Sequence, residues 1–198
     1  MMGFRRLWLS WRWARGWLWL AAAGALLAAL HVRVSSQHDA RAVFLHTEPH
    51  ALADLMADFS YQPNLGSWSV VGDASNATAW WYVVALACGA RCSGRGAVVA
   101  QAVPRGDRPA HGRDAREHRV SVSLETCSKL PVLPWPALCD EIELSAVVSA
   151  AAGGGARLAL RGAARCPVLW AVRGGCASRL RHHVDAHLMR VRTALQGA

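Results

Sequence analysis

The first 38 residues contain no acidic side chain, and all 13 Asp and Glu residues lie in the rest of the chain. Lysine is almost absent too, because Lys129 is the only lysine among 22 basic residues. This arginine bias, beside many Ala and Gly residues, is typical of coding bias, so clusters of arginine give no argument for a nucleic-acid site. Beyond residue 38 the chain is only mildly basic, and we expect no nucleic-acid partner.

Sequence motifs of common catalytic and metal sites are also missing. The chain has no G-x-x-x-x-G-K-[ST] phosphate loop and no G-x-S-x-G nucleophile elbow. His183 and His187 have the spacing of a zinc-binding helix, but Val184 stands where an H-E-x-x-H protease carries glutamate. We interpret these histidines as part of a solvated helix face. The sequence therefore predicts no catalytic residue, no metal and no cofactor, and we expect that the protein is not an enzyme.

The cysteines leave two interpretations open. An even count of six permits three disulfides, whose connectivity the sequence does not fix. A domain of about 160 residues, however, buries roughly two-thirds of its unfolded surface and folds without covalent links. Free and mostly buried thiols are therefore the favoured interpretation. The cysteines are Cys88, Cys92, Cys127, Cys139, Cys166 and Cys176.

Residues 1–38 form a basic leader, and residues 39–198 are expected to fold as one domain. Within the leader, an unbroken apolar segment covers residues 16–30 and follows four arginines. Three interpretations compete: a retained N-terminal membrane anchor, a cleaved signal peptide and a mitochondrial transit peptide. We favour a single-pass anchor in the endoplasmic reticulum or another endomembrane, with Trp17 and Trp19 in contact with the membrane. A secreted or mitochondrial location is the alternative.

An anchor of this kind places the domain across the membrane from Met1, because basic flanks stay on the cytosolic side. The tripeptide Asn76-Ala77-Thr78 is then a possible glycosylation sequon. Such tripeptides are common by chance, and this one adds little to the assignment.

The domain is expected to begin with a strand over residues 40–47 and a short helix over 49–59. Strands of good period-2 alternation follow in the second half, where Val120, Val122 and Leu124 oppose Ser121 and Ser123. Alternation of this quality is typical of an antiparallel sheet with one buried face. The strands expected after the short helix cover residues 68–71, 78–86, 95–103, 118–126, 141–149 and 157–163, with an exposed loop at 104–116.

A long helix is predicted over residues 176–196. Leu180, Val184, Leu188, Val191 and Leu195 recur along one of its sides. The buried face of the sheet is the only apolar surface available to this stripe. We therefore predict an α+β fold of the helix-grip type: a curved antiparallel sheet of about six to seven strands wrapped around a long C-terminal helix, after an N-terminal hydrophobic helix.

Several segments between about residues 41 and 195 resemble the VASt domain, a START-like family of lipid- and sterol-binding domains. They include Val43-Phe44 before the short helix, Trp81 to Leu86, Ala97 to Gln101, the Lys129-Leu130-Pro131 turn and Val168-Leu169-Trp170. The chain departs from the family in its N-terminal hydrophobic segment, because VASt proteins usually carry their anchor after the domain. The resemblance implies a non-catalytic lipid or sterol binder that works near a membrane.

We therefore expect one apolar lipid or sterol to lie between the sheet and the terminal helix, in a membrane-anchored lipid-binding or transfer domain. Trp135, between two prolines, is expected to contact the membrane. The alternative is a membrane-anchored interaction protein with a side-chain-filled core, whose basic helix face binds a protein or an anionic lipid. The predicted lipid-binding residues are Val122, Leu124, Ile142, Leu144, Leu158, Leu160, Leu180, Val184 and Leu188.

Overall fold

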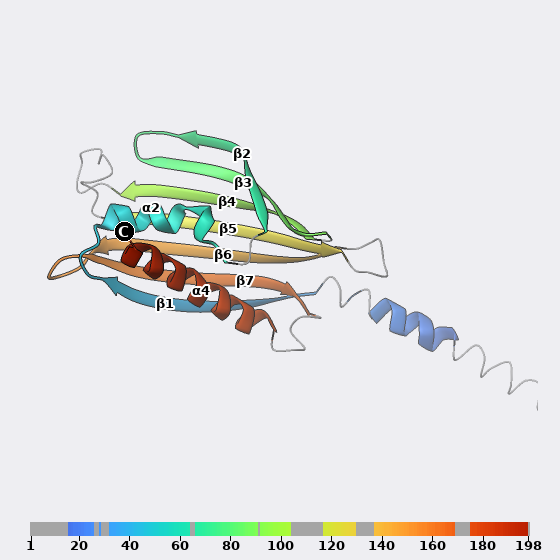
Figure 1. The fold of residues 1–198 in the computed structure, drawn as a ribbon. Helices are drawn as coiled ribbons and strands as arrows, with labels where there is room; N and C mark the ends of the chain where they lie inside the picture. Colours follow the sequence, from blue (N-terminus) through green and yellow to red (C-terminus); the bar gives the residue numbers. More distant parts are fainter. Residues whose placement is uncertain are drawn as a thin grey trace, which may run out of the picture.

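The structure is a computed structural model that describes residues 16–25, 28, 32–63, 66–90, 92–103, 117–129, 137–168 and 175–197. Seven antiparallel strands form one open sheet in the order β1-β7-β6-β5-β4-β3-β2, and helices α2 and α4 cover the same face (Figure 1). The α+β class, the antiparallel sheet and the long C-terminal helix are thus confirmed. The elements are β1 (Arg33–Phe44), α2 (Pro49–Ala57), η1 (Phe59–Tyr61), β2 (Ser67–Ser75), β3 (Ala79–Gly89), β4 (Cys92–Val103), β5 (Glu117–Lys129), β6 (Ala137–Ala150), β7 (Ala156–Pro167) and α4 (Gly175–Gly197).

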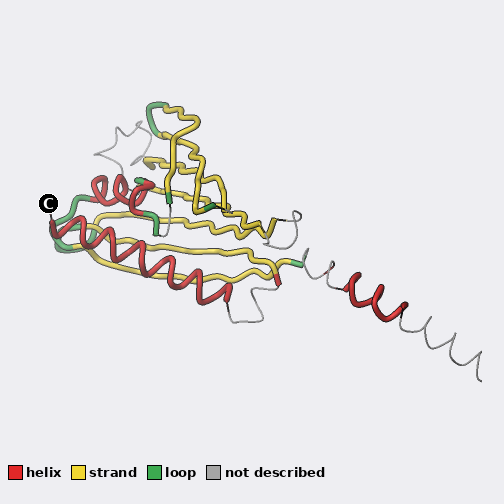
Figure 2. Tube along the Cα trace, turned by 45° about the vertical axis from the view of Figure 1, so that its right-hand side comes forward, coloured by secondary structure: helices red, strands yellow, loops and turns green. Residues whose placement is uncertain are grey.

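The adjacent strands β5, β6 and β7 follow the alternation of the sequence. Val120, Val122 and Leu124 of β5 are buried, whereas Ser121 and Ser123 are exposed on the other face. β5 pairs with β6 from Glu117↔Ser149 to Lys129↔Ala137, and β6 pairs with β7 from Glu141↔Arg165 to Ala150↔Ala156. The sheet therefore has one buried face, which α2 and α4 cover (Figure 2), and one solvent-exposed face.

Strand β1 is longer than predicted. It begins at Arg33 instead of residue 40, and it pairs without interruption with β7 from Arg33↔Pro167 to Phe44↔Ala156. Residues 33–38, which the sequence analysis assigned to the leader, are therefore part of the sheet. This part of the strand is not predicted by residue propensities, because Ser and Gln do not favour strands on their own.

Glycines at two places in the sheet, the β6–β7 turn and the middle of β7, explain local geometry. Gly153, Gly154 and Gly155 have φ values of 90°, 97° and 85° in the turn that joins β6 to β7 as a hairpin. On β7, Gly162 lies directly under helix α4. A Cβ atom there would lie 3.0 Å from Leu180 Cδ1 and 3.1 Å from Val184 Cγ2, so the missing side chain lets the helix approach the sheet.

Helix α2 and the following turn are fixed to the sheet by one tyrosine. The Tyr82 hydroxyl donates to the Ala57 carbonyl oxygen at 2.6 Å and accepts from the Phe59 backbone N–H at 2.8 Å. Burial raises the pKa of Tyr82 to about 12. Its stacked partner Trp80 lies with ring centroids 5.7 Å apart. The end of α2 therefore gains hydrogen-bond partners from a strand.

The predicted single-pass N-terminal membrane anchor is wrong. Among the residues that the structure describes, no helix is both long enough and apolar enough to cross a membrane. The 15 apolar residues of segment 16–30 would rise only about 22 Å as a helix, against a hydrocarbon core of about 30 Å. Residues 16–25 are helical, and Trp17 and Trp19 are 68% and 76% exposed. Helix formation over the whole of 16–30, and membrane contact by these tryptophans, stay predictions.

Candidate ligand pocket between the sheet and helix α4

A pocket of about 260 Å³ opens between β5, β6, β7 and the first turns of α4. We call it the sheet–helix pocket. Leu124 of β5 and Ile142 of β6 are direct cross-strand partners, and Leu180 of α4 lines the pocket from the helix side. The full lining is Pro63, Leu124, Thr126, Asp140, Ile142, Ala164, Cys166, Arg179, Leu180, His182 and His183.

The pocket brings together three of the predicted lipid-binding residues, namely Leu124, Ile142 and Leu180. The others are buried and belong to the hydrophobic core cluster, and they do not line this pocket. Two of them also border a shallow depression of about 280 Å³ on the opposite face of the sheet. Trp135 lies outside the described residues. The residues packed in the core are Val122, Leu144, Leu158, Leu160, Val184 and Leu188.

One end of the sheet–helix pocket is polar. Thr126 and Asp140 face each other across β5 and β6, two register positions beyond Leu124 and Ile142. Arg179 of α4 donates a hydrogen bond to Asp140 Oδ2, while Asp140 Oδ1 is buried and has no partner among the described residues. Burial raises the pKa of Asp140, and the nearby Arg179 opposes this shift. The pocket therefore has an apolar wall at one end and the Arg179–Asp140 ion pair at the other, where Asp140 Oδ1 can still accept a hydrogen bond.

Two histidines of α4, His183 in the lining of this pocket and His187 one turn further, are buried, so their predicted exposure is wrong. His183 is 6% exposed and His187 is fully buried. His183 Nε2 lies 3.1 Å from Gln62 Oε1, and His187 Nδ1 lies 3.0 Å from the Tyr61 carbonyl oxygen. Because both partners accept, the ring nitrogens donate, and each imidazole is held in one neutral form.

Burial, with His187, His182 and Arg190 nearby, lowers the pKa of His183 to about 4. Burial also lowers the pKa of His187, against the opposing effect of its hydrogen bond to Tyr61. Both rings are therefore neutral near pH 7. The spacing of the two histidines could have indicated their burial. They lie three and seven positions after Leu180, beside the apolar stripe of the helix, and a buried histidine there requires a hydrogen-bond partner such as Gln62.

The favoured interpretation of free thiols is wrong, because all six cysteines form disulfides. Cys127 and Cys139 lie opposite each other on β5 and β6, and Cys88 and Cys92 close the β3–β4 hairpin. The third disulfide, between Cys166 and Cys176, joins the end of β7 to the first turn of α4. It therefore fixes the helix beside the sheet–helix pocket, whose wall includes Cys166.

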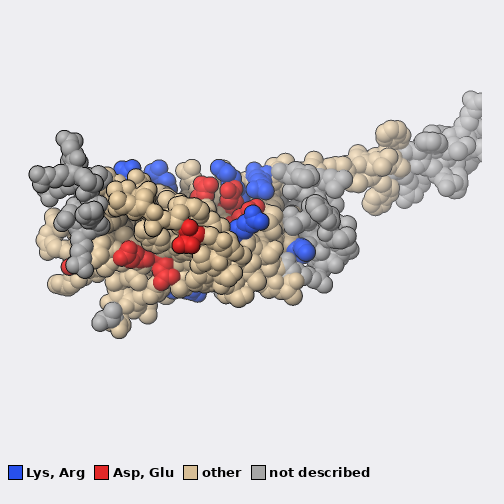
Figure 3. Space-filling model, turned by 90° about the horizontal axis from the view of Figure 1, so that it is seen from above, with Lys and Arg blue, Asp and Glu red and all other residues tan. Residues whose placement is uncertain are grey.

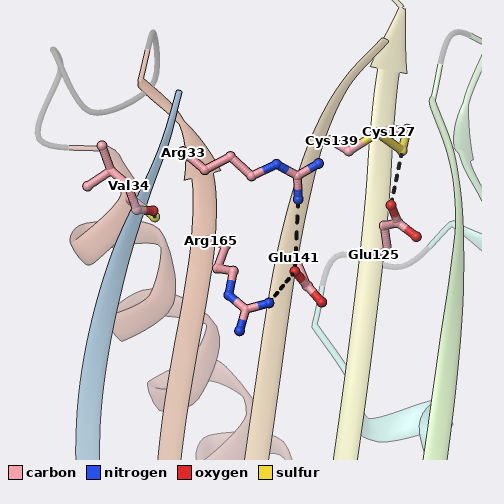
Figure 4. A network of polar contacts seen from close by, with 8 residues as sticks. Arg33, Val34, Glu125, Cys127, Cys139, Glu141 and Arg165 are labelled. Carbon is pink, nitrogen blue, oxygen red and sulfur yellow. Dashed lines mark hydrogen bonds and ion pairs between the residues drawn. A yellow bond between two sulfur atoms is a disulfide. The ribbon is translucent and has the colours of Figure 1, made fainter. Parts of the chain in front are cut away.

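The solvent-exposed face of the sheet carries ion pairs near the disulfide between Cys127 and Cys139 (Figure 4). Glu141 accepts from Arg165 at 3.3 Å and lies 3.9 Å from Arg33, so three strands share one ion network. Beside it, Glu125 and the two sulfur atoms of Cys127 and Cys139 are close enough to hold a cation in principle. Disulfide sulfur is not a thiolate, so these residues offer no metal site in the oxidised protein.

A second, more polar pocket of about 200 Å³ lies between α2 and the β2–β3 turn. His118 at the start of β5 is 7% exposed and lines it, together with Asp54 and Trp80. Burial lowers the pKa of His118, and the carboxylate of Asp54 opposes this shift. The sequence does not predict this pocket, because its walls come from segments that are distant in the chain.

Comparisons with known proteins identify no family. No protein-family model and no curated protein matches the chain. Among solved structures, the chain is similar to an uncharacterised protein from Rhizobium leguminosarum, with 12% identity and a TM-score of 0.40. The match covers 84% of this chain and 99% of that protein. A TM-score this low supports no conclusion about function.

Proposed function

We propose that the protein is a START-like, helix-grip domain that binds one amphiphilic lipid in the sheet–helix pocket. The observation that supports this proposal is the pairing of an apolar wall, Leu124 and Ile142, with a polar end at Asp140. The order of strands and terminal helix is compatible with a helix-grip fold, and the sequence segments that resemble VASt domains agree with this assignment. Binding and transfer, rather than catalysis, are the proposed activities.

The size of the pocket limits the ligand. Ligand sites usually measure roughly 300–1,000 Å³, and this pocket, at about 260 Å³, is just below that range. It suits one end of a lipid, with the remainder outside the mouth. Enclosing a whole sterol requires the core beneath α4 to open.

Energetics favour an amphiphile over a pure hydrocarbon. Burial of roughly 300 Å² of apolar ligand surface contributes about 7–8 kcal/mol at about 25 cal/mol per Å². Association costs at least about 4 kcal/mol, so the apolar wall alone gives only weak binding. A hydroxyl donor on the ligand would use the unpaired Asp140 Oδ1 and add about 1.5–3 kcal/mol, since hydrogen bonds to charged groups are the stronger ones.

The test is a titration of the purified protein with a fluorescent fatty alcohol and a fluorescent sterol, after mass spectrometry of co-purifying lipids. Ile142→Trp should fill the pocket and abolish binding. Val99→Trp is the matched control, because Val99 is 47% exposed on the other face of the sheet. If Ile142→Trp folds and binds as tightly as the unaltered protein, the sheet–helix pocket is not the site.

The rival function is an interaction domain, and it is favoured because six of the nine predicted lipid-binding residues are buried in the core cluster and do not line the sheet–helix pocket. In that case the exposed Arg181 and Arg192 of α4 would contact a protein or an anionic lipid surface. Vesicles of phosphatidylserine and of phosphatidylcholine distinguish the two proposals. Binding to the anionic vesicles alone, lost in Arg181→Ser with Arg192→Ser and unaffected by Ile142→Trp, would support the rival.

A further inference from the structure

The turn between β2 and β3 presents an asparagine in a fixed and accessible position. Asn76 is exposed, and its Oδ1 accepts from the backbone N–H groups of Thr78 at 3.0 Å and Ala79 at 2.8 Å. The Thr78 hydroxyl lies 3.3 Å from the same oxygen. Among the described residues nothing accepts from Asn76 Nδ2. The side-chain oxygen therefore holds the turn, while the amide nitrogen makes no hydrogen bond to the described residues.

These residues form an N-x-[ST] acceptor sequence with alanine in the middle position. The three disulfides are an independent observation that bears on it. Disulfides form and persist in oxidising compartments, such as the lumen of the secretory pathway. Proteins that pass through that lumen also meet the enzyme that glycosylates this sequence. The acceptor sequence, the exposure of Asn76 and the paired cysteines are therefore all compatible with glycosylation in the secretory pathway.

We propose that Asn76 is an N-glycosylation site that receives an oligosaccharide from a lipid-linked glycosyl pyrophosphate. Asn76 Nδ2 forms a bond to the anomeric carbon of the first sugar, and the bond from that carbon to the pyrophosphate oxygen breaks. The pyrophosphate leaves with the electron pair, and Nδ2 loses one proton to a base of the transferring enzyme. No oxidation or reduction takes place.

The surroundings of the turn give the glycan a role. Strand β2 is an edge of the sheet, and the β2–β3 hairpin exposes Val70 at 52%, Val71 at 61% and Trp81 at 43%. Seen from above, the described surface is mostly uncharged, with separate groups of acidic and basic side chains (Figure 3). An unprotected apolar edge strand invites pairing with another chain. A hydrophilic glycan at the end of this hairpin would oppose such pairing.

The glycan would not block the sheet–helix pocket. The pocket lies at β5, β6 and β7, whereas β2 is the far edge of the same sheet. This proposal therefore stands or falls separately from the proposed lipid binding, and ligand titrations on the glycosylated and deglycosylated protein should agree.

The experiment is expression of the full chain in a eukaryotic host, followed by intact-mass spectrometry before and after treatment with peptide N-glycosidase. The unaltered protein should carry one discrete glycan mass that the enzyme removes. Asn76→Asp keeps an oxygen acceptor for the turn but has no amide nitrogen, and it should have the unmodified mass. Thr78→Ala should lose the glycan too, whereas Thr78→Ser should keep it.

An unaltered chain that is made at its unmodified mass would overturn the proposal, as would a glycan that persists in Asn76→Asp. Intact disulfides, measured by thiol labelling, show that each variant has folded. The deglycosylated protein should also form larger species in size-exclusion chromatography at high concentration. If it stays as dispersed as the glycosylated form, the shielding role is wrong even where the modification is present.

Discussion

The buried histidines of α4 predict that the protein loses stability in mild acid. His183 has a pKa of about 4 when folded, against 6.5 for the free side chain. The unfolded chain therefore binds the proton first as the pH falls below about 6.5, and the free energy of unfolding decreases until the folded state also binds it near pH 4. Linkage gives a loss of about 2 kcal/mol from His183 between pH 7.5 and pH 5, and about 3 kcal/mol in full.

This loss is large beside a typical domain stability of about 5–15 kcal/mol. His187 acts in the same direction, because burial lowers its pKa as well. Urea denaturation at a series of pH values above about 5 measures the effect, and a loss of about 2 kcal/mol lowers the midpoint by about 1 M. The lower pH limit keeps most carboxylates ionised, so the histidines dominate the slope.

His183→Gln is the informative variant, since an amide can still donate to Gln62 but does not titrate. Its stability should depend less on pH by about 2 kcal/mol over the same range. His182→Gln is the matched control, because His182 is adjacent and exposed. If His183→Gln and the unaltered protein show the same pH slope, His183 is not held neutral by burial and the argument fails.

Three further predictions concern packing and covalent links. Gly162→Ala should destabilise the protein by about 1–3 kcal/mol in urea denaturation, because its Cβ would press on α4; an unchanged midpoint would contradict the close approach of helix and sheet. Replacing Cys166 and Cys176 together by Ser should lower the free energy of unfolding by about 3 kcal/mol, because the disulfide closes a loop with a sequence separation of 10. Thermal unfolding measures the loss. If the variant is less stable than the unaltered protein by the same amount under reducing conditions, where neither has the disulfide, the loss does not come from the disulfide. Tyr82→Phe should cost about 1–3 kcal/mol, because two backbone groups lose their partner; hydrogen exchange should rise at the end of α2, and unchanged protection there would refute the assignment.

Much of the sheet could be predicted because its signal is local. The period-2 alternation of β5, β6 and β7 and the apolar stripe of α4 each depend on residues a few positions apart. The start of β1 could not be predicted, since Ser35, Ser36 and Gln37 favour no strand by themselves. They are held by β7, which lies more than a hundred residues later in the chain.

The pocket and the pairing of cysteines depend on register, which the sequence does not state. Cys127 meets Cys139 only because β5 and β6 align as they do, and one residue of slip would place them on opposite faces. The same alignment brings Thr126 to Asp140. Burial of His183 required Gln62, whose position depends on how the η1 turn meets α4.

The pairing of β1 with β7 has a consequence for how the protein is made. β1 emerges early in translation, but its partner ends at residue 167. At about 5–20 residues per second, the interval between completing β1 and beginning β7 lasts roughly 6–22 s. During this interval β1 has no strand to pair with, because β7 has not yet been synthesised. Nascent chains stalled before residue 156 should therefore need chaperones to stay dispersed.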